Sequence, residues 1–280
     1  MANIGQMNVL LVVKSVDFGV YLDGGELGEI LLPKRQVPPE CQIGDSLTVF
    51  LYHDTENRLI ATIQKPYALI DEVGYLKVKT VNDIGAFLDW GIPKDLFVPF
   101  REQGQPMQPG NSYLVYVYFD KVSSRITGSS KLRKFLDKPW FELEVGKEVD
   151  LIIAEQTEAG FKAIINHAAW GLIFNSDVFQ PLAVGDQVKG FVKAIREDGK
   201  YDLVLQKPGY EKVPGIAEQI LDALQANGGF LPMNDDSSPE EIKNRFGISK
   251  KTFKKAIGAL FKSRHITIEP KGISLAGKKK

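Results

Sequence analysis

The sequence predicts a mainly β, multidomain fold: three tandem five-stranded barrels followed by a small α+β domain. Two observations predict it. A strand-turn-strand pattern recurs about 66 positions further along the chain, and self-similarity at a fixed period indicates a series of similar domains. After residue 209 the hydrophobic period changes from that of strands to that of helices. A string of small β domains is typical of a protein that binds extended ligands.

The repeat is defined by glycines, prolines and acidic residues at matched positions. Copy one has Phe18-Gly19, Leu31-Leu32-Pro33, Gly44-Asp45, Asp54 and Arg58. Copy two has the corresponding positions Ile84-Gly85, Phe97-Val98-Pro99, Gly110-Asn111, Asp120 and Arg125-Ile126. A weaker third copy includes Gly160, Gly185-Asp186 and Tyr201-Asp202-Leu203. The copies therefore predict three domains of one type.

Each copy alternates apolar and polar residues as half-buried strands do. In the strand after Gly44, the side chains of Val49 and Leu51 share one face, while those of Phe50 and Tyr52 point the other way. Five short strands in about 60 residues favour a small closed barrel, because closure removes exposed strand edges.

The pattern of the C-terminal segment predicts three helices and a hairpin. Pro214 to Ala226 has apolar residues at helical spacing, and Ser238-Pro239-Glu240-Glu241 predicts a capped helix start. Ser249 is expected to cap a third helix, whose apolar face is formed by Phe253, Ile257, Leu260 and Phe261. Residues 266–269 and 272–275 are predicted to pair as a hairpin. This order is that of a winged helix-turn-helix.

The predicted domain boundaries follow from these patterns. Barrel 1 is expected at 1–66, barrel 2 at 67–130, a helical linker at 131–143, barrel 3 at 144–210, the winged helix at 211–275 and a disordered basic tail at 276–280.

Composition excludes several classes of protein. Hydrophobic residues make up 44% and charged residues 25%, which is ordinary for a globular protein. The longest apolar run, Val9 to Val13, is far shorter than the roughly 20 residues of a membrane-spanning helix, and no secretion signal is present at Met1. The single cysteine, Cys41, favours a cytoplasmic location, and the three scattered histidines predict no metal site.

Charge is unevenly distributed although the net charge is zero. Residues 214–280 hold 12 lysines and arginines and 7 acidic residues, whereas residues 1–213 hold 23 and 28. The C-terminal segment therefore has the electrostatics expected of a nucleic-acid contact.

The repeat resembles the S1 RNA-binding domain, an oligonucleotide-binding (OB-fold) barrel. That family has aromatic residues flanking a glycine and an aspartate followed by a basic residue. Copy one matches with Phe18, Tyr21, Asp54 and Arg58, and copy two with Phe87, Asp120 and Arg125. The family's histidine on the third strand is replaced by Leu31 in copy one and by Val98 in copy two. Copy three has Ala159 and Lys162 at the aromatic positions, so it keeps the frame of the family but not its binding surface, and whether it binds RNA is left open.

The whole chain resembles the CvfB (YitL-like) family of bacterial proteins, which have three S1 domains followed by a winged helix. The runs that carry this resemblance are Ile195 to Leu203, Ser237 to Ile242 and Phe246 to Lys251. Membership implies RNA binding, a role in controlling gene expression, including virulence-factor expression in some pathogens, and no known catalytic activity.

Candidate RNA-binding residues are aromatic and basic. Aromatic rings stack unpaired bases and nearby cations hold the phosphates. The predicted set is Phe18, Tyr21, Lys34, Arg35, Arg58, Phe87, Arg125, Lys250, Lys251, Lys254 and Lys255. The alternative is that the aromatic residues belong to barrel cores and that the lysines only solvate a helix. Trp90 is predicted to pack between domains, and Asp54 and Asp120 to fix turns by Asx hydrogen bonds.

The leading hypothesis is a non-catalytic RNA-binding regulator that uses single-stranded RNA as its partner, with no cofactor and no membrane contact. The alternative is a transcription factor that binds DNA through the winged helix. A ribonuclease would need clustered carboxylates, and Asp235-Asp236 are expected to lie in a loop without partners. A protein scaffold is the fourth candidate. The sequence leaves open the RNA target, the oligomeric state and whether the winged helix contacts RNA, DNA or protein.

Overall fold

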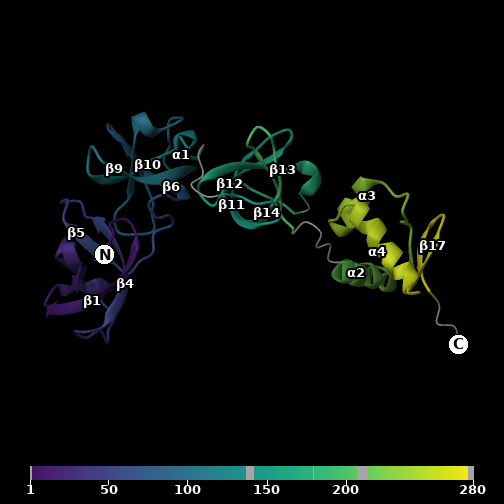
Figure 1. Cartoon of the computed structure of the whole chain (residues 1–280), viewed down its shortest axis with the longest axis horizontal. Coiled ribbons are helices and arrows are strands. Elements are labelled where there is room, and N and C mark those ends of the chain that lie inside the picture. The colour runs from purple at the N-terminus through teal and green to yellow at the C-terminus, as the bar shows by residue number, and fades with distance from the viewer. Residues whose placement is uncertain (1, 137–141, 179, 207–212, 277–280) are drawn as a thin grey trace. The chain divides into compact units, whose positions relative to one another are not determined.

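The structure is a computed structural model that describes residues 2–136, 142–178, 180–206 and 213–276 (Figure 1). The chain forms two compact units, Met1–Pro139 and Trp140–Lys280, and each is described by itself. The predicted disordered tail lies, apart from Ala276, outside the described residues, as do positions 137–141 of the predicted linker.

Barrel 1 is closed. Its strands are β1 (Met7–Val16), β2 (Gly19–Asp23), β3 (Glu29–Pro33), β4 (Ser46–His53) and β5 (Leu59–Thr62). They run in the order β1-β2-β3-β5-β4, and the parallel pairing of Leu31 with Ile60 joins β3 to β5. Short 3-10 turns, η1 (Gly25–Leu27) and η2 (Lys34–Gln36), follow β2 and β3. The core contains Val12, Leu22, Leu32 and Leu51, so the inward positions are the alternating apolar ones.

Barrel 2 repeats this strand order. Its strands are β6 (Val73–Asn82), β7 (Gly85–Leu88), β8 (Leu96–Pro99), β9 (Ser112–Asp120) and β10 (Arg125–Ser129), and η3 (Phe100–Glu102) follows β8. The sheet runs β10-β9-β6-β7-β8, and no hydrogen-bonded ladder joins β8 to β10 among the described residues. The two end strands still meet, because a Cβ added at Gly128 would lie 2.8 Å from Val98 and 2.9 Å from Leu96. The barrel is thus held closed on this side by side-chain packing.

Barrel 3 is closed, with the same topology as barrel 1. Its strands are β11 (Glu148–Gln156), β12 (Gly160–Ile165), β13 (Ala169–Phe174), β14 (Gln187–Ile195) and β15 (Tyr201–Val204), and η4 (Asn175–Asp177) follows β13. The core cluster of barrel 3 is built on residues such as Leu151, Ile153 and Val192.

The three barrels share two backbone features. The first strand has a register shift at Val12/Lys14, Val78/Thr80 and Ile153/Glu155, and such bulges bend a strand so that it can serve two neighbours. The second strand begins with a glycine whose Cβ would clash with the carbonyl oxygen of the facing strand, which belongs to Leu32, Val98 and Ile173 in barrels 1, 2 and 3. The repeated glycine is therefore required by close backbone approach.

The outward face of β4 is buried between barrels 1 and 2. Phe50 and Tyr52 belong to one hydrophobic cluster with Trp90, Ile92 and other barrel 2 residues. Trp90 is only 2% exposed, and its indole nitrogen donates to the carbonyl oxygen of Ala68 at 2.7 Å. The alternation predicted for β4 and the domain-packing role predicted for Trp90 are confirmed.

A short helix, α1 (Arg133–Leu136), covers the matching face of barrel 2. The Phe135 ring stacks on Tyr116 with centroids 4.2 Å apart and lies 5.2 Å from Tyr118. Tyr116 and Tyr118 occupy the positions that Phe50 and Tyr52 hold in barrel 1. Each of the first two barrels therefore buries these two aromatic residues against the segment that follows it.

The C-terminal domain is a winged helix. Its elements are α2 (Val213–Ala226), β16 (Phe230–Leu231), α3 (Pro239–Phe246), α4 (Lys250–Lys262), β17 (Ile266–Glu269) and β18 (Gly272–Leu275). Ser238 and Glu241 form the predicted capping box, and Ser249 caps α4. The sequence missed β16, which joins the hairpin as a third strand. Together with the barrels, this confirms the predicted fold class.

One predicted core residue of α4 is wrong. Phe253, Ile257 and Leu260 are buried, but Phe261 is 52% exposed. The buried stripe ends at Leu260, two residues before α4 ends at Lys262, because the core beyond Leu260 is supplied by the hairpin residues Ile266 and Ile273. Phe261 lies at the edge of that stripe.

Candidate nucleic-acid interface

The aromatic pair predicted on barrel 1 lies at its surface. Phe18 precedes β2 and is 58% exposed, and its ring meets that of Tyr21 edge to face at 6.3 Å. The Lys14 Nζ atom lies 5.6 Å from the Tyr21 ring centroid. Neither aromatic side chain is part of the barrel core, so the core alternative is excluded for both. Lys34 and Arg35 are exposed on η2, after β3.

Arg58, also predicted to bind RNA, is already engaged within barrel 1. Its guanidinium donates to Asp54 Oδ2 from Nε at 2.8 Å and from a terminal nitrogen at 2.7 Å, and its other terminal nitrogen lies 2.8 Å from Glu56. Asp54 Oδ1 accepts hydrogen bonds from the backbone nitrogens of Glu56 and Arg58, as predicted for a turn-fixing residue. The charge of Arg58 is therefore balanced by two carboxylates.

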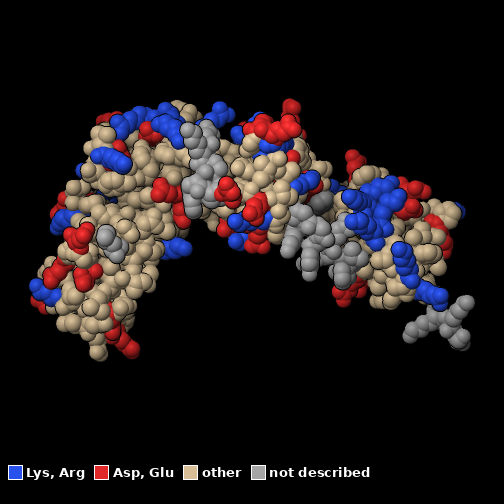
Figure 2. Space-filling model, in the orientation of Figure 1, with Lys and Arg blue, Asp and Glu red and all other residues tan. Residues whose placement is uncertain are grey.

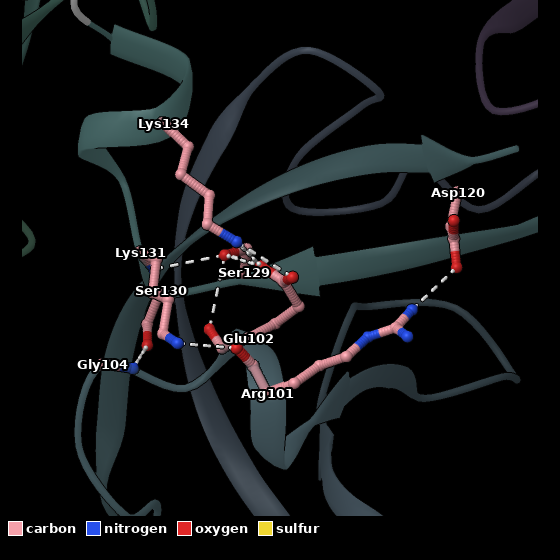
Figure 3. A network of polar contacts seen from close by, with 8 residues as sticks. All are labelled: Arg101, Glu102, Gly104, Asp120, Ser129, Ser130, Lys131 and Lys134. Carbon is pink, nitrogen blue, oxygen red and sulfur yellow. Dashed lines mark hydrogen bonds and ion pairs between the residues drawn. The ribbon is translucent and has the colours of Figure 1, made fainter. Parts of the chain in front are cut away.

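The corresponding pair of barrel 2 is arranged differently. Asp120 accepts from the Val122 backbone nitrogen at 3.1 Å and from the Ser123 hydroxyl at 2.8 Å, so its predicted turn-fixing role is also confirmed. Its cationic partner is Arg101, at 3.3 Å, rather than Arg125 (Figure 3). Arg125 lies opposite Asp120 in the β9–β10 ladder, but within the described ranges no carboxylate forms an ion pair with Arg125. The hydrogen bond from Ser123 lowers the pKa of Asp120, which keeps it ionised.

A cavity of about 610 Å³ lies over the outward face of β7 and β8. Phe87 and Phe97 are directly opposite each other on these strands, with ring centroids 5.1 Å apart. Arg125 and Arg101 also line the cavity, as does Ile84, which is 60% exposed. The full lining comprises Tyr52, His53, Thr55, Ile84, Phe87, Trp90, Pro93, Lys94, Asp95, Phe97, Pro99, Arg101, Asp120, Ser123, Arg125, Ile126 and Thr127. Two predicted residues, Phe87 and Arg125, are thus brought together.

Sequence reasoning placed the third-strand position of copy two one residue too late. Val98 points into the barrel core and is fully buried, whereas Phe97 faces the cavity. Leu31 pairs with Tyr21, and Phe97 pairs with Phe87 in the same register. Phe97 and Arg101 were missed, although both stand 66 positions after the copy one residues Leu31 and Arg35. That spacing was the signal that could have found them.

A buried polar network supports the cavity wall next to Arg101 (Figure 3). The Glu102 carboxylate accepts from the Ser129 hydroxyl at 2.7 Å and from Lys134 Nζ at 2.9 and 3.0 Å. Lys131 Nζ donates to the Arg101 carbonyl oxygen at 2.7 Å. Burial raises the pKa of Glu102, but the hydrogen bonds from Ser129 and Lys134 outweigh it and the net pKa is lowered. The network joins η3, β10 and α1.

Barrel 3 has a lysine, Lys162, where barrels 1 and 2 have the aromatic residues Tyr21 and Phe87. Lys162, at the Tyr21 position, lies with its Nζ 4.8 Å from the centre of the Trp170 ring. The Arg196 guanidinium lies 5.4 Å from the Phe174 ring and pairs with Asp202 at 2.7 Å. Two aromatic rings of β13, those of Trp170 and Phe174, therefore each have a cation over them.

The predicted lysines of the winged helix lie along α4. Lys251, Lys254 and Lys255 are exposed, and Lys250 is half-buried. Figure 2 shows lysine and arginine side chains gathered over the region of α3 and α4. Asp235 and Asp236 lie in a loop, as predicted. The Asp235 carboxylate lies 3.5 Å from Lys254 Nζ, and the Asp236 carbonyl oxygen accepts from Lys250. Lys250 and Lys254 thus have partners in their own domain.

Metal-binding clusters and membrane-spanning helices are two further features that a chain of this length can contain. Across the described residues, no group of three or more His, Cys, Asp or Glu side chains could hold a metal ion. No helix in the same part of the chain has the length and hydropathy to cross a membrane.

Comparisons with known proteins place these domains. Residues 4–64 match the S1 domain and residues 218–275 match the CvfB-like winged helix domain. The chain is 26% identical to conserved virulence factor B of Staphylococcus aureus (strain bovine RF122 / ET3-1), over 98% of this chain and 95% of that one. It is also similar to a crystal structure described as a multidomain protein with nucleic acid binding domains from Streptococcus pneumoniae, with 26% identity, coverage of 97% and 98%, and a TM-score of 0.41.

The relative that carries the assignment is the uncharacterized protein YitL of Bacillus subtilis (strain 168). It is 30% identical over 272 residues, which cover 92% of this chain and 89% of YitL. Because this identity extends over more than two thirds of both chains, the chain belongs to the family of YitL and conserved virulence factor B.

Proposed function

We propose that this chain is a non-catalytic RNA-binding protein that holds single-stranded RNA and acts as a post-transcriptional regulator of gene expression. The observation that carries the proposal is the cavity of barrel 2, where Phe87 and Phe97 lie beside Arg125. The match of barrel 1 to the S1 domain supports nucleic-acid binding by this type of barrel. Relatives named conserved virulence factor B associate the family with virulence.

The chemistry of the cavity suits unpaired nucleotides. The exposed π-faces of single-stranded bases stack on aromatic rings, with about 1–3 kcal/mol per base, largely regardless of base identity. Arg125 supplies a cation within the same cavity, and the second arginine of the lining, Arg101, is balanced by Asp120. One stacking surface next to one uncompensated guanidinium is sufficient for a nucleotide, and it carries no group arranged to cleave the phosphodiester.

We further propose that binding is shared among four modules with the boundaries stated from the sequence. The Phe18–Tyr21 surface with Lys34 and Arg35 would extend the strand over barrel 1, and α4 would hold phosphates at the far end. Barrel 3 would act largely as a spacer. Modest sites that are linked in one chain gain affinity through effective concentration, so no single module needs to bind tightly.

Photo-crosslinking tests this proposal on the full chain. A single-stranded RNA with 4-thiouridine at successive positions is irradiated with the protein, and crosslinked peptides are identified by mass spectrometry. The proposal predicts crosslinks in β7, β8 and β10, with a second group in α4. Crosslinks confined to surfaces that contain none of the proposed residues would contradict it.

The second candidate function is a DNA-binding transcriptional regulator, which the lysine-rich exposed face of α4 favours. In a winged helix this element contacts nucleic acid, and lysines there neutralise phosphates with little base discrimination. A reproducible footprint on duplex DNA that is lost in the double variant Lys251→Ala, Lys255→Ala would support this candidate over the first.

A further inference from the structure

The cavity of barrel 2 has one wall that belongs to barrel 1. Tyr52, His53 and Thr55, from the end of β4 and the β4–β5 turn, line the same space as Phe87, Phe97 and Arg125. A volume of about 610 Å³ lies within the range of roughly 300–1,000 Å³ that is usual for pockets that enclose one small molecule. An isolated barrel 2 would present an open face where the chain instead presents a pocket.

This wall is held in place by direct bonds between the barrels. Lys94 of barrel 2 donates from Nζ to the carbonyl oxygens of His53 at 2.5 Å and Asp54 at 3.0 Å. Lys94 itself lines the pocket, and burial lowers its pKa, with Arg125 adding to the effect. The Phe50–Trp90 contact lies at the same junction. The turn therefore cannot withdraw from barrel 2 without breaking hydrogen bonds to a charged group.

The turn is also rigid in itself. Asp54 Oδ1 accepts two backbone hydrogen bonds, both of 2.9 Å, from Glu56 and Arg58. A wall that is fixed both internally and to its neighbour has a defined distance from the Phe87 and Phe97 rings. Such preorganisation is what allows a pocket to discriminate by shape.

The wall contains a polar atom that the protein does not satisfy. The His53 Nδ1 atom is buried, and no hydrogen-bond partner for it exists among the described residues. Leaving a buried polar group unpaired costs about 1–3 kcal/mol, and unexplained cases of this kind point to a ligand or a water. Burial lowers the pKa of His53, with Lys94 adding to the effect, so the imidazole is neutral near neutral pH.

We propose that the barrel 1 turn Tyr52–Thr55 is a specificity element of the barrel 2 site, which makes it a composite pocket for one unpaired nucleotide of a strand. This rests on the proposed function. A base can enter between the aromatic rings and the turn only when it is unstacked and unpaired. In a duplex that extrusion costs a few kcal/mol, whereas in a single strand it costs much less. The pocket thus accepts single strands and disfavours duplexes.

The experiment blocks the pocket from the barrel 1 side. Thr55 is an exposed residue of the turn, so Thr55→Trp places a large side chain at the pocket wall without changing any residue of barrel 2. Thr48→Trp is the matched control, because Thr48 is an exposed threonine of β4 outside the pocket lining. The probes are a single-stranded RNA of about 12 nucleotides that contains 2-aminopurine, the same RNA annealed to its complement, and 2-aminopurine ribonucleoside monophosphate.

We expect Thr55→Trp to weaken binding of the single strand about tenfold, as loss of one stacked base implies, and to leave binding of the duplex unchanged. The preference for single strand over duplex therefore shrinks in this variant and stays unchanged in Thr48→Trp. Unchanged single-strand binding by Thr55→Trp would overturn the composite pocket and leave the proposed function standing. Failure of the unaltered protein to bind the single strand would instead overturn the proposed function.

Two further results decide the proposal without a variant. In the unaltered protein, 4-thiouridine crosslinks from a single strand should include peptides that contain residues 52–55, and their absence when β7 and β8 are crosslinked would overturn the inference. The monophosphate should bind far more weakly than the strand, because it reaches only the pocket. Equal affinity of the two probes would overturn the assignment to a strand.

Discussion

The Trp90 ring of barrel 2 packs edge-on against Phe50 of barrel 1, with centroids 5.3 Å apart and planes at 86°. Phe50 lies on the outward face of β4, outside the core of barrel 1, and its side chain is part of the hydrophobic core of barrel 2. This contact sets barrel 1 against the cavity of barrel 2 and so brings the Tyr52–Thr55 turn to the proposed site.

Removing Trp90 should destabilise the junction. Trp90→Ala should reduce the free energy of unfolding of this region by about 3–5 kcal/mol, because it empties a buried aromatic site and frees the Ala68 carbonyl oxygen. Hydrogen exchange of peptides from β4 and β6 measures the loss locally. Tyr75→Ala, at a half-exposed ring on β6, is the control and should change exchange little. Equal exchange in the two variants would show that Trp90 does not hold the barrels together.

The two equivalent arginines should contribute unequally to binding. Arg125→Ala should reduce the salt dependence of RNA binding by about one phosphate contact, while Arg58→Ala should have a smaller effect because Asp54 and Glu56 already balance its charge. The measurement is the slope of log affinity against log salt concentration for each variant. A larger loss for Arg58→Ala than for Arg125→Ala would contradict the assignment.

The aromatic pair of barrel 2 should contribute stacking. Phe87→Ala and Phe97→Ala should each weaken single-stranded RNA binding about tenfold, which corresponds to the lower part of the range for one stacked base. Phe119→Ala is a suitable control, because Phe119 is also partly exposed on barrel 2 but lies outside the cavity lining. Fluorescence anisotropy of a labelled strand measures all three. A loss of RNA affinity in Phe87→Ala but not in Phe97→Ala would show that the two rings do not bind RNA as a pair.

The Glu102 network should make stability depend on pH. Because the pKa of Glu102 is lower in the folded protein than its ordinary value of 4.5, its contribution is fully present above that value and disappears as the pH falls through the folded pKa. Glu102→Gln should therefore cost about 2 kcal/mol at neutral pH and almost nothing in strong acid. Urea unfolding at neutral and at strongly acidic pH measures the free energy of unfolding of each variant. Glu26→Gln, at an exposed glutamate, is the control. If the loss of unfolding free energy in Glu102→Gln persists in strong acid, the ionised Glu102 carboxylate is not the source of the stabilisation.

The fold was largely predictable because its rules are local and repeated. Alternation in β4, the repeated glycine and the Ser238 capping box each express one physical constraint that a few neighbouring residues carry. The 66-residue spacing of the repeat, with Pro33 aligned to Pro99, identifies Phe97 rather than Val98 as the equivalent of Leu31.

The site was less predictable because its partners come from distant parts of the chain. Arg58 and Arg125 occupy equivalent positions, but Asp120 forms its ion pair with Arg101, and Arg125 lines the cavity. The barrel 1 wall depends on Lys94 reaching carbonyl oxygens 40 and 41 positions away. Side chains that act through packing between domains leave no periodic pattern in the sequence.

A preference for single-stranded RNA is the property on which the proposed function depends, and one comparison of affinities measures it. The full chain is titrated against one labelled single-stranded RNA and against duplex DNA of the same length, across a series of salt concentrations. We expect the single-stranded RNA to bind at least about tenfold more tightly, or about 1.4 kcal/mol, with a steep salt dependence. Equal or tighter binding to the duplex DNA would contradict it.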